Sequence, residues 1–186
     1  MPELLIIVGV PVLVVLIWGI ATYNRFVRLR FHIRESWADI DVELKRRYDL
    51  IPNLVATVKG YAKHEREVLE RVTELRNRAA QSTGAAAQQA VDETALMLGV
   101  KQLFAVAEAY PELRSDAHFL ALQKELSLTE DRIAAARRFF NGNVREMNNL
   151  RQMFPTSIVG NIFGFQLGSF FELESEAERV VPRVES

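Results

Sequence analysis

His64 and Glu65 begin a pattern that can bind zinc on a helix, because His-Glu-x-x-His places two imidazoles on one face. The second histidine would stand at position 68, which is Val68. The other two histidines, His32 and His118, show no ligand-like spacing. We therefore expect no metal site.

Other catalytic chemistry also lacks the residues that it needs. The chain has no cysteine, which excludes thiolate nucleophiles and sulfur-ligated metals. The glycines at 160, 164 and 168 follow no strand-like segment and have no adjacent lysine, so they do not form a phosphate-binding loop. The histidines offer no pattern for a nucleophilic triad. We expect a protein that is not an enzyme and has no cofactor.

The overall charge argues against nucleic acid as a partner. Lys and Arg total 23, and Asp and Glu total 24. No strong global field would therefore attract a polyanion.

Polar residues that interrupt apolar helical stripes are the candidate site residues of the bundle. A buried charge must be paired and hydrogen-bonded, or it costs several kcal/mol. One interpretation is a polar site for a small ligand inside the bundle. The other, which the pattern favours, is a network that fixes helix register. The candidate residues are Arg47, Glu65, Glu130, Arg137, Asn141 and Asn148.

The elements that would position these residues are helices. Apolar residues recur at three- and four-residue steps over about 24–80 and again over 88–109, with a loop at 81–87. Over 113–153 a heptad stripe predicts close packing along a partner helix. Its members are Phe119, Leu126, Ile133, Phe140, Met147 and Phe154. The predicted fold class is all-α, with an N-terminal transmembrane helix followed by an antiparallel bundle of three to four long helices.

Pro52 leaves two topologies open. The apolar phase runs through it unbroken, which suggests one kinked helix. A chain reversal near Asp49–Pro52 would instead give four helices of comparable length, running up-down-up-down. Helix length slightly favours the reversal.

The first segment predicts a membrane anchor. No charged or strongly polar side chain occurs from Leu4 to Ala21, and this run spans about 27 Å as a helix. Trp18 and Tyr23 fall where an aromatic belt would lie. A signal peptide would need a basic start and a cleavage site, and the sequence shows neither. A buried core helix would show a polar face, and this run has none. We expect an anchor at 1–23, a cytoplasmic bundle at 24–171 and a polar tail at 172–186.

Four arginines after this run predict its orientation. Arg25, Arg28, Arg30 and Arg34 precede any later acidic residue, whereas the N-terminal flank has no Lys or Arg. Positive charge stays on the cytoplasmic side, so the N-terminus should lie outside and the helical domain in the cytoplasm. Membrane lipid is thus one expected partner, through the N-terminal helix.

A crowded apolar segment follows Pro155. It holds eight large apolar residues between Ile158 and Phe171. One interpretation is a lid over an end of the bundle, and the other is a docking patch for membrane or a protein. The candidate interaction residues are Ile162, Phe163, Phe165, Phe170 and Phe171.

Two stretches resemble the LemA family. Residues 41–65 read DVELKRRYDLIPNLVATVKGYAKHE, and residues 135–150 read AARRFFNGNVREMNNL. Phe154-Pro155 and Phe163-Gly164-Phe165 add to the resemblance, whereas Phe140 and Met147 stand where the family pattern often has tyrosine. The resemblance implies an N-terminal anchor with an outside N-terminus and an antiparallel helical bundle. It implies no enzymatic activity, and it gives no catalytic residue.

Function is therefore expected to lie in binding. Some LemA-like proteins belong to magnetosome membranes, and others are encoded beside a membrane metalloprotease or a TPM-domain protein, which supports a scaffold or adaptor role only by association. The leading hypothesis is a membrane-tethered module that binds unknown protein partners or itself. The rival is a sensor of a small ligand or lipid, with a cavity lined by Arg47, Glu130 and Arg137.

Overall fold

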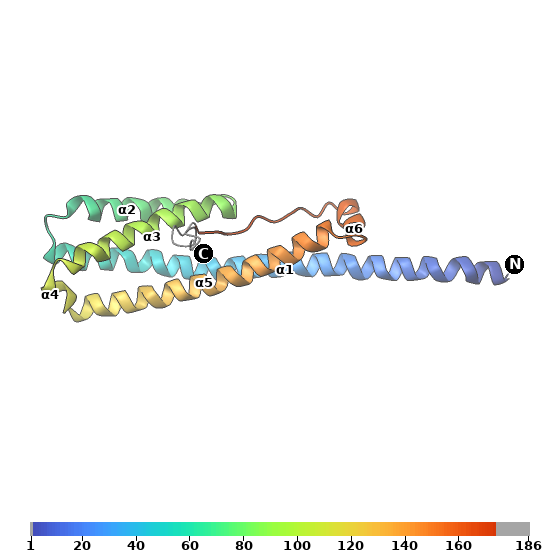
Figure 1. Ribbon diagram of the computed structural model, residues 1–186, viewed down its shortest axis with the longest axis horizontal. Coiled ribbons are helices and arrows are strands. Elements are labelled where there is room, and N and C mark those ends of the chain that lie inside the picture. The colour runs from blue at the N-terminus through green and yellow to red at the C-terminus, as the bar shows by residue number, and fades with distance from the viewer. Residues whose placement is uncertain (1, 174–186) are drawn as a thin grey trace, which may run out of the picture. The chain divides into compact units, whose positions relative to one another are not determined.

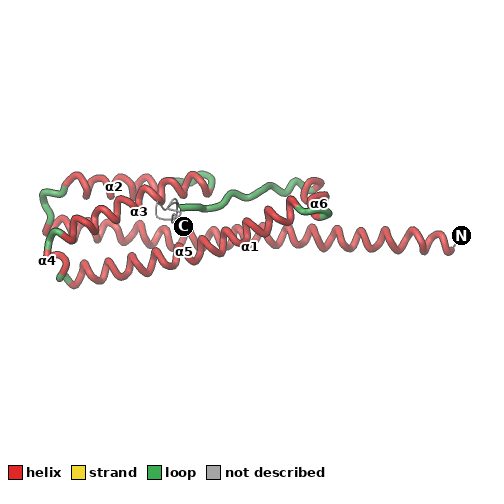
Figure 2. Tube along the Cα trace, viewed as in Figure 1, coloured by secondary structure: helices red, strands yellow, loops and turns green. Residues whose placement is uncertain are grey.

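The structure is a computed structural model that describes residues 2–173, with side chains from residue 7 on. Within these residues the chain forms six helices and no strand (Figures 1 and 2). The helices are α1 (Pro2–Tyr61), α2 (Arg66–Gln81), α3 (Ala86–Glu108), α4 (Pro111–Arg114), α5 (Ala117–Gln152) and α6 (Thr156–Ile162). The predicted all-α fold class is confirmed.

The chain divides into two compact units, and α1 and α5 each contribute to both. The four-helix unit, named for its four longer helices, comprises Asp39–Arg137 and residues 169–173. The two-helix unit, named for its two long helices and also containing α6, comprises residues 2–38 together with Arg138–Gly168. The expected division into anchor, bundle and tail stays a prediction, and most of the expected tail, at 174–186, lies outside the described residues.

The four-helix unit packs the second part of α1, α2, α3 and the first part of α5 around one apolar core. Short connections join these helices, as expected for antiparallel neighbours. Figure 1 shows α2 and α3 side by side in opposite directions. The fully buried aliphatic residues of this core include Ile51, Leu54, Val58, Val72, Leu96, Leu103 and Leu113.

The favoured reversal near Asp49–Pro52 is wrong. α1 continues through Pro52 to Tyr61, and the chain turns back at residues 62–65. Ile51 and Leu54, on either side of the proline, are fully buried, whereas Pro52 itself is exposed. Burying this apolar stripe stabilises a continuous helix even though proline removes one of its hydrogen bonds.

A side chain from α2 compensates for the bond that Pro52 cannot make. Proline has no N–H, so the carbonyl of Tyr48, four residues earlier, loses its donor within the helix. Arg76 Nε donates to that carbonyl oxygen at 3.0 Å. This contact satisfies the partly buried backbone acceptor and joins α1 to α2 at the proline.

The two-helix unit packs the first part of α1 against the end of α5, α6 and the segment that follows α6. Phe26, Leu29, Met147, Leu150, Val159 and Phe165 form its core. In the same unit, the rings of Trp37 on α1 and Phe140 on α5 lie 5.2 Å apart. Asn143 Nδ2 lies 3.3 Å from the buried Ser36 hydroxyl. The heptad stripe of α5 is therefore confirmed as a buried face up to Met147, whereas Phe154, beyond the end of the helix, is exposed.

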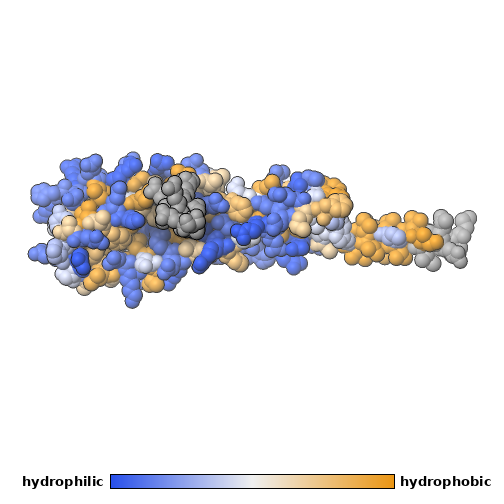
Figure 3. All heavy atoms as spheres, viewed as in Figure 1, coloured by the Kyte–Doolittle hydropathy of each residue, from blue (hydrophilic) through white to orange (hydrophobic). Residues whose placement is uncertain are grey.

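Residues 7–20 of α1 carry an uncovered apolar surface. Large aliphatic side chains from Ile7 to Ile20 are 52–69% exposed, and Figure 3 shows this stretch as hydrophobic surface. α1 is long and apolar enough to cross a membrane, by length and composition.

Candidate functional site

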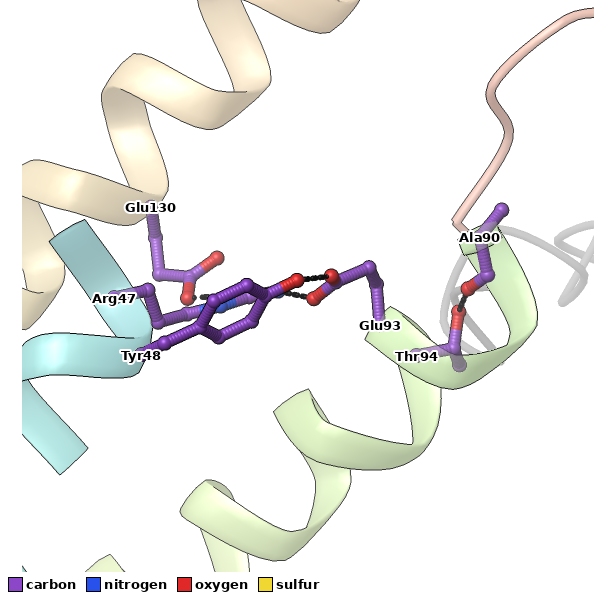
Figure 4. Close-up of polar contacts among 6 residues, drawn as sticks. All are labelled: Arg47, Tyr48, Ala90, Glu93, Thr94 and Glu130. Carbon is purple, nitrogen blue, oxygen red and sulfur yellow. Dashed lines mark hydrogen bonds and ion pairs between the residues drawn. The ribbon is translucent and has the colours of Figure 1, made fainter. Parts of the chain in front are cut away.

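Arg47 is the centre of a buried polar network in the four-helix unit. Its side chain comes from α1 and is 1% exposed. Nη1 donates to Glu130 Oε1 of α5 at 2.8 Å, and Nη2 donates to Glu93 Oε2 of α3. The Tyr48 hydroxyl donates to Glu93 Oε1. Figure 4 shows the guanidinium between the two carboxylates, so one cation joins three helices.

The charges of this network depend on one another. Burial raises the pKa of the Glu93 carboxyl, and Arg47 and Tyr48 offset only part of that rise. Burial opposes the charge of Arg47, but Glu130 and Glu93 outweigh it and raise the pKa of the guanidinium. Burial and the hydrogen bond to Glu93 raise the pKa of Tyr48, which keeps its hydroxyl protonated as a donor. Arg47 therefore stays positively charged and bonded to the carboxyl groups of Glu93 and Glu130.

The first turns of α3 extend this polar region. Asp92 is buried beside Glu93 and accepts a hydrogen bond from Arg78 Nε of α2 at 2.7 Å. The Thr94 hydroxyl donates to the Ala90 carbonyl within α3 (Figure 4). Together, Asp92 and Glu93 bind arginines from two different neighbouring helices, which fixes the rotation of α3 about its own axis.

Of the six residues predicted to form a polar network, the structure brings together Arg47 and Glu130. Glu65 is half-buried in the connection before α2, and Arg137 is half-buried two turns beyond Glu130 on α5. Asn141 belongs to the two-helix unit. A network of all six residues stays a prediction, and the Arg47–Glu130 ion pair is the contact that the structure shows within the set.

Asn148, the sixth residue, has a separate role in the two-helix unit. Its amide accepts from the Gly168 N–H at 2.8 Å and donates to the Gly168 carbonyl at 3.0 Å. This pair of bonds holds the segment after α6 against α5.

Sequence reasoning missed Glu93 and Tyr48. A signal for Glu93 exists, since it stands three residues before Leu96 and seven before Val100, on the apolar stripe of its helix. A carboxylate at such a position predicts a buried cation on a neighbouring helix.

A basic groove lies on the four-helix unit between α1 and α2. It has a volume of about 600 Å³, and its apolar lining residues are Val55 and Leu69. Arg66 pairs with Glu70 at 2.6 Å, whereas neither Lys59 nor Lys63 forms an ion pair with any residue in the described range. The lining residues are Val55, Lys59, Lys63, Arg66, Leu69, Glu70 and Thr73.

The predicted interaction patch is split by the structure. Ile162 and Phe163 are exposed, and Phe170 is half-buried. Phe165 and Phe171 are buried, which corrects their assignment to an exposed patch. Phe165 is core because it stacks on Phe26 at 4.6 Å and lies under the guanidinium of Arg30.

Among the side chains of residues 7–173, no three His, Asp or Glu are grouped as a metal ion would need. The cavities described around the bundle are likewise lined by residues other than the Arg47, Glu130 and Arg137 set.

A helical bundle joined to one apolar helix of membrane-spanning length defines the class of this protein. Residues 36–185 match the model of the LemA family, and the chain belongs to that family. The resemblance seen in the sequence is confirmed.

Three relatives are identical to this chain at about a quarter of the aligned positions. Protein LemA of Metamycoplasma hominis is 25% identical over 164 residues, which cover 84% of this chain and 71% of that protein. The magnetosome protein MamQ of Magnetospirillum gryphiswaldense is 23% identical, over 80% of this chain and 64% of its own length. Magnetosome protein MamQ 2 of Paramagnetospirillum magneticum is also 23% identical, over 81% and 64%. The chain therefore spans less than two thirds of the length of these MamQ proteins.

Proposed function

We propose that this LemA-family protein is a membrane-anchored, non-enzymatic scaffold or adaptor whose helical domain binds proteins at the cytoplasmic face. The observation that carries the proposal is the uncovered apolar surface of α1 from Ile7 to Ile20. In water this surface would cost about 25 cal/mol per Å², and a bilayer removes that cost. The name "magnetosome protein" of the MamQ relatives adds support for a membrane location.

The closed interior supports a function at the surface. Arg47 and Glu93 are 1% and 0% exposed and contact each other directly. A ligand that entered would have to break these contacts and leave a charge unpaired, at a cost of about 3–5 kcal/mol.

The basic groove is the surface that we assign to the protein partner. Lys59 and Lys63 supply charge, and Val55 and Leu69 supply an apolar lining. This combination suits an acidic segment that also carries apolar side chains, because charge steers the encounter and apolar burial holds the complex.

The exposed arginines beyond the apolar surface support the proposed orientation, and they are Arg25, Arg28, Arg30 and Arg34. The test uses the absence of native cysteine. With Lys63→Cys as the only thiol, a membrane-impermeant maleimide should label the full chain only after the cells are permeabilised. Labelling of this thiol in intact cells would contradict a cytoplasmic domain, and recovery of the chain in the soluble fraction would contradict the anchor.

The alternative function is a small-ligand or lipid sensor with a polar site inside the bundle. One observation favours it: Arg47 Nε is buried and makes no hydrogen bond with any described residue. Native mass spectrometry of the purified full chain separates the two. A stoichiometric small molecule that is lost in Arg47→Met would support the sensor, and an unliganded chain would support the scaffold.

A further inference from the structure

An exposed apolar face surrounds α6 in the two-helix unit. Phe154 is 82% exposed and Ile162 is 72% exposed. Ile158 and Phe163 are exposed beside them. We call these four residues the α6 face. Side chains of this size, grouped and uncovered, mark a surface that binds something apolar.

The α6 face is held firmly against α1. The ring of Phe163 lies 4.7 Å from that of Tyr23. A side chain at Gly160 would meet Phe26 at 3.1 Å and Arg151 at 2.8 Å, so glycine permits this close approach. Arg151 also donates from Nε to the Phe165 carbonyl at 2.7 Å and from Nη2 to Asn161 Oδ1 at 2.5 Å.

These contacts fix the level of the α6 face along α1. Tyr23 and Phe26 lie three and six residues after Ile20, the last residue of the exposed aliphatic run. At 1.5 Å per residue the face therefore lies about 4–9 Å beyond the end of that run. The polar interface of a bilayer is roughly 5–8 Å thick on each side of its hydrocarbon, so the two levels coincide.

The chemistry around the face matches the same environment. Trp18 and Tyr23 are half-buried and pack against the core beneath α6, and such side chains favour the membrane interface. Arg28 is exposed on α1 at this level, and so is Arg25, which pairs with Glu146 at 2.9 Å. They would meet anionic headgroups while the apolar side chains enter between the acyl chains.

We propose that the α6 face inserts into the headgroup and acyl boundary of the leaflet that α1 enters, as a second membrane contact beside the span. The proposal rests on the membrane anchorage proposed above. The occupant is lipid because the face lies directly beyond the exposed aliphatic run of the span and at the level of exposed arginines. The second contact restrains the tilt of α1 where the helix leaves the bilayer.

The absence of native cysteine allows a depth measurement on the full chain. Single cysteines at Phe154 or Ile162 carry an environment-sensitive fluorophore, and the protein is reconstituted in phosphatidylcholine–phosphatidylglycerol vesicles. Brominated lipid quenches labels in the bilayer, and iodide quenches labels in water. Phe139→Cys is the control, because Phe139 is also a large exposed apolar residue, at 58%, and lies on α5, thirteen residues before its end. Leu13→Cys reports on the span.

The expected result is several-fold stronger quenching by brominated lipid, and several-fold weaker quenching by iodide, at 154 and 162 than at 139. Ile162→Asp should reduce lipid quenching at 154, with helicity by circular dichroism unchanged. Labels at 154 and 162 that behave like the label at 139 would overturn the proposal. Shielding from both quenchers would also overturn it, in favour of contact with a protein or a second copy. Lipid quenching absent at 13 would instead reject the anchorage itself, so the two failures are distinguishable.

Discussion

Arg47 places a positive charge between two carboxylates in the interior of the four-helix unit. Desolvation of these ions opposes folding, and their attraction offsets it only while each has its partner. The arrangement therefore does more to specify which helix faces meet than to raise stability. It joins α1, α3 and α5 at one level, and no apolar contact alone would fix that level.

Arg47→Ala should destabilise the protein by about 3–5 kcal/mol, because Glu93 stays buried without its cation. The loss should depend on pH. In the variant the folded-state pKa of Glu93 lies still further above its unfolded value of about 4.3, so the folded state binds the proton more tightly. Stability is then lost as pH rises through the folded pKa, and the deficit should be smaller at about pH 5 than at about pH 8.

Urea unfolding at both pH values measures this deficit. Arg132→Ala is the control, since Arg132 is about half exposed and lies as far as 4.0 Å from its Glu43 partner. We expect the control to change stability by less than about 1 kcal/mol. An Arg47→Ala deficit that is small and independent of pH would contradict the account of the network.

Phe140 and Phe139 are neighbours with opposite surroundings. Phe140 is buried and contacts Trp37, whereas Phe139 is exposed. Phe140→Ala should cost about 3–5 kcal/mol, and Phe139→Ala less than about 1 kcal/mol. Equal losses in denaturant unfolding would show that the buried face of α5 is misassigned.

The sequence predicts some of these residue positions because burial follows helical periodicity. Arg47 and Glu130 are recognisable as polar interruptions of apolar stripes. Their contact with Glu93 is not recognisable in this way, because it depends on which helix of the bundle lies opposite. From the sequence we expect Phe165 in an exposed patch, whereas in the structure it lies in the core. Hydrophobicity alone does not distinguish an apolar residue that packs against another ring from one that stays exposed.

Among the elements, α1 is unusual because it continues through two internal prolines, Pro11 and Pro52, without ending. The Arg76 contact to the Tyr48 carbonyl explains how the helix continues through Pro52. The apolar periodicity of the sequence, which runs through Pro52 unbroken, is consistent with this continuous helix. Comparing helix lengths favours a chain reversal near Pro52, because such a comparison takes no account of a hydrogen-bond donor supplied by another helix.

A double-mutant cycle tests this explanation. Arg76→Met should cost about 1.5–3 kcal/mol, because the Tyr48 carbonyl loses a charged donor. In a Pro52→Ala background the new N–H can bond to that carbonyl, so the same substitution should cost about 1 kcal/mol less. Arg71 of α2, which pairs with Glu74 at 2.9 Å, is the control and should show no coupling to position 52. Coupling of equal size at Arg71 and Arg76 would contradict the role of Arg76.

Two glycines within helices should respond to alanine in opposite ways. At Gly99 of α3, a Cβ would lie 2.8 Å from Leu75 Cδ1 of α2, so Gly99→Ala should destabilise by about 1–3 kcal/mol. At Gly142 of α5 no atom lies within 4 Å of such a Cβ, so Gly142→Ala should stabilise by about 0.5–1 kcal/mol. Thermal unfolding measures both, and a stabilised Gly99→Ala would contradict the close packing of α2 on α3.

At the scale of the whole molecule, three surfaces define the proposed function: the uncovered apolar surface of α1, the α6 face and the basic groove. The first is predictable from the sequence, because a charge-free run of this length is specific. The groove is not, since Lys59, Lys63 and Arg66 become neighbours only where the chain turns at 62–65. The family match fixes ancestry, while the proposed partner chemistry comes from the groove itself.

The most direct test of a membrane-anchored adaptor is photo-crosslinking from the groove in living cells. A benzophenone amino acid at Thr73, an exposed lining residue, should give discrete irradiation-dependent adducts of the full chain in the membrane fraction. The same amino acid at the exposed Leu128 of α5 is the positional control and should not give these adducts. Lys59→Glu with Lys63→Glu should abolish the adducts at Thr73 while helicity is unchanged, because the acidic partner is repelled. No adduct from Thr73, or the same adducts after the charge reversal, would contradict the account.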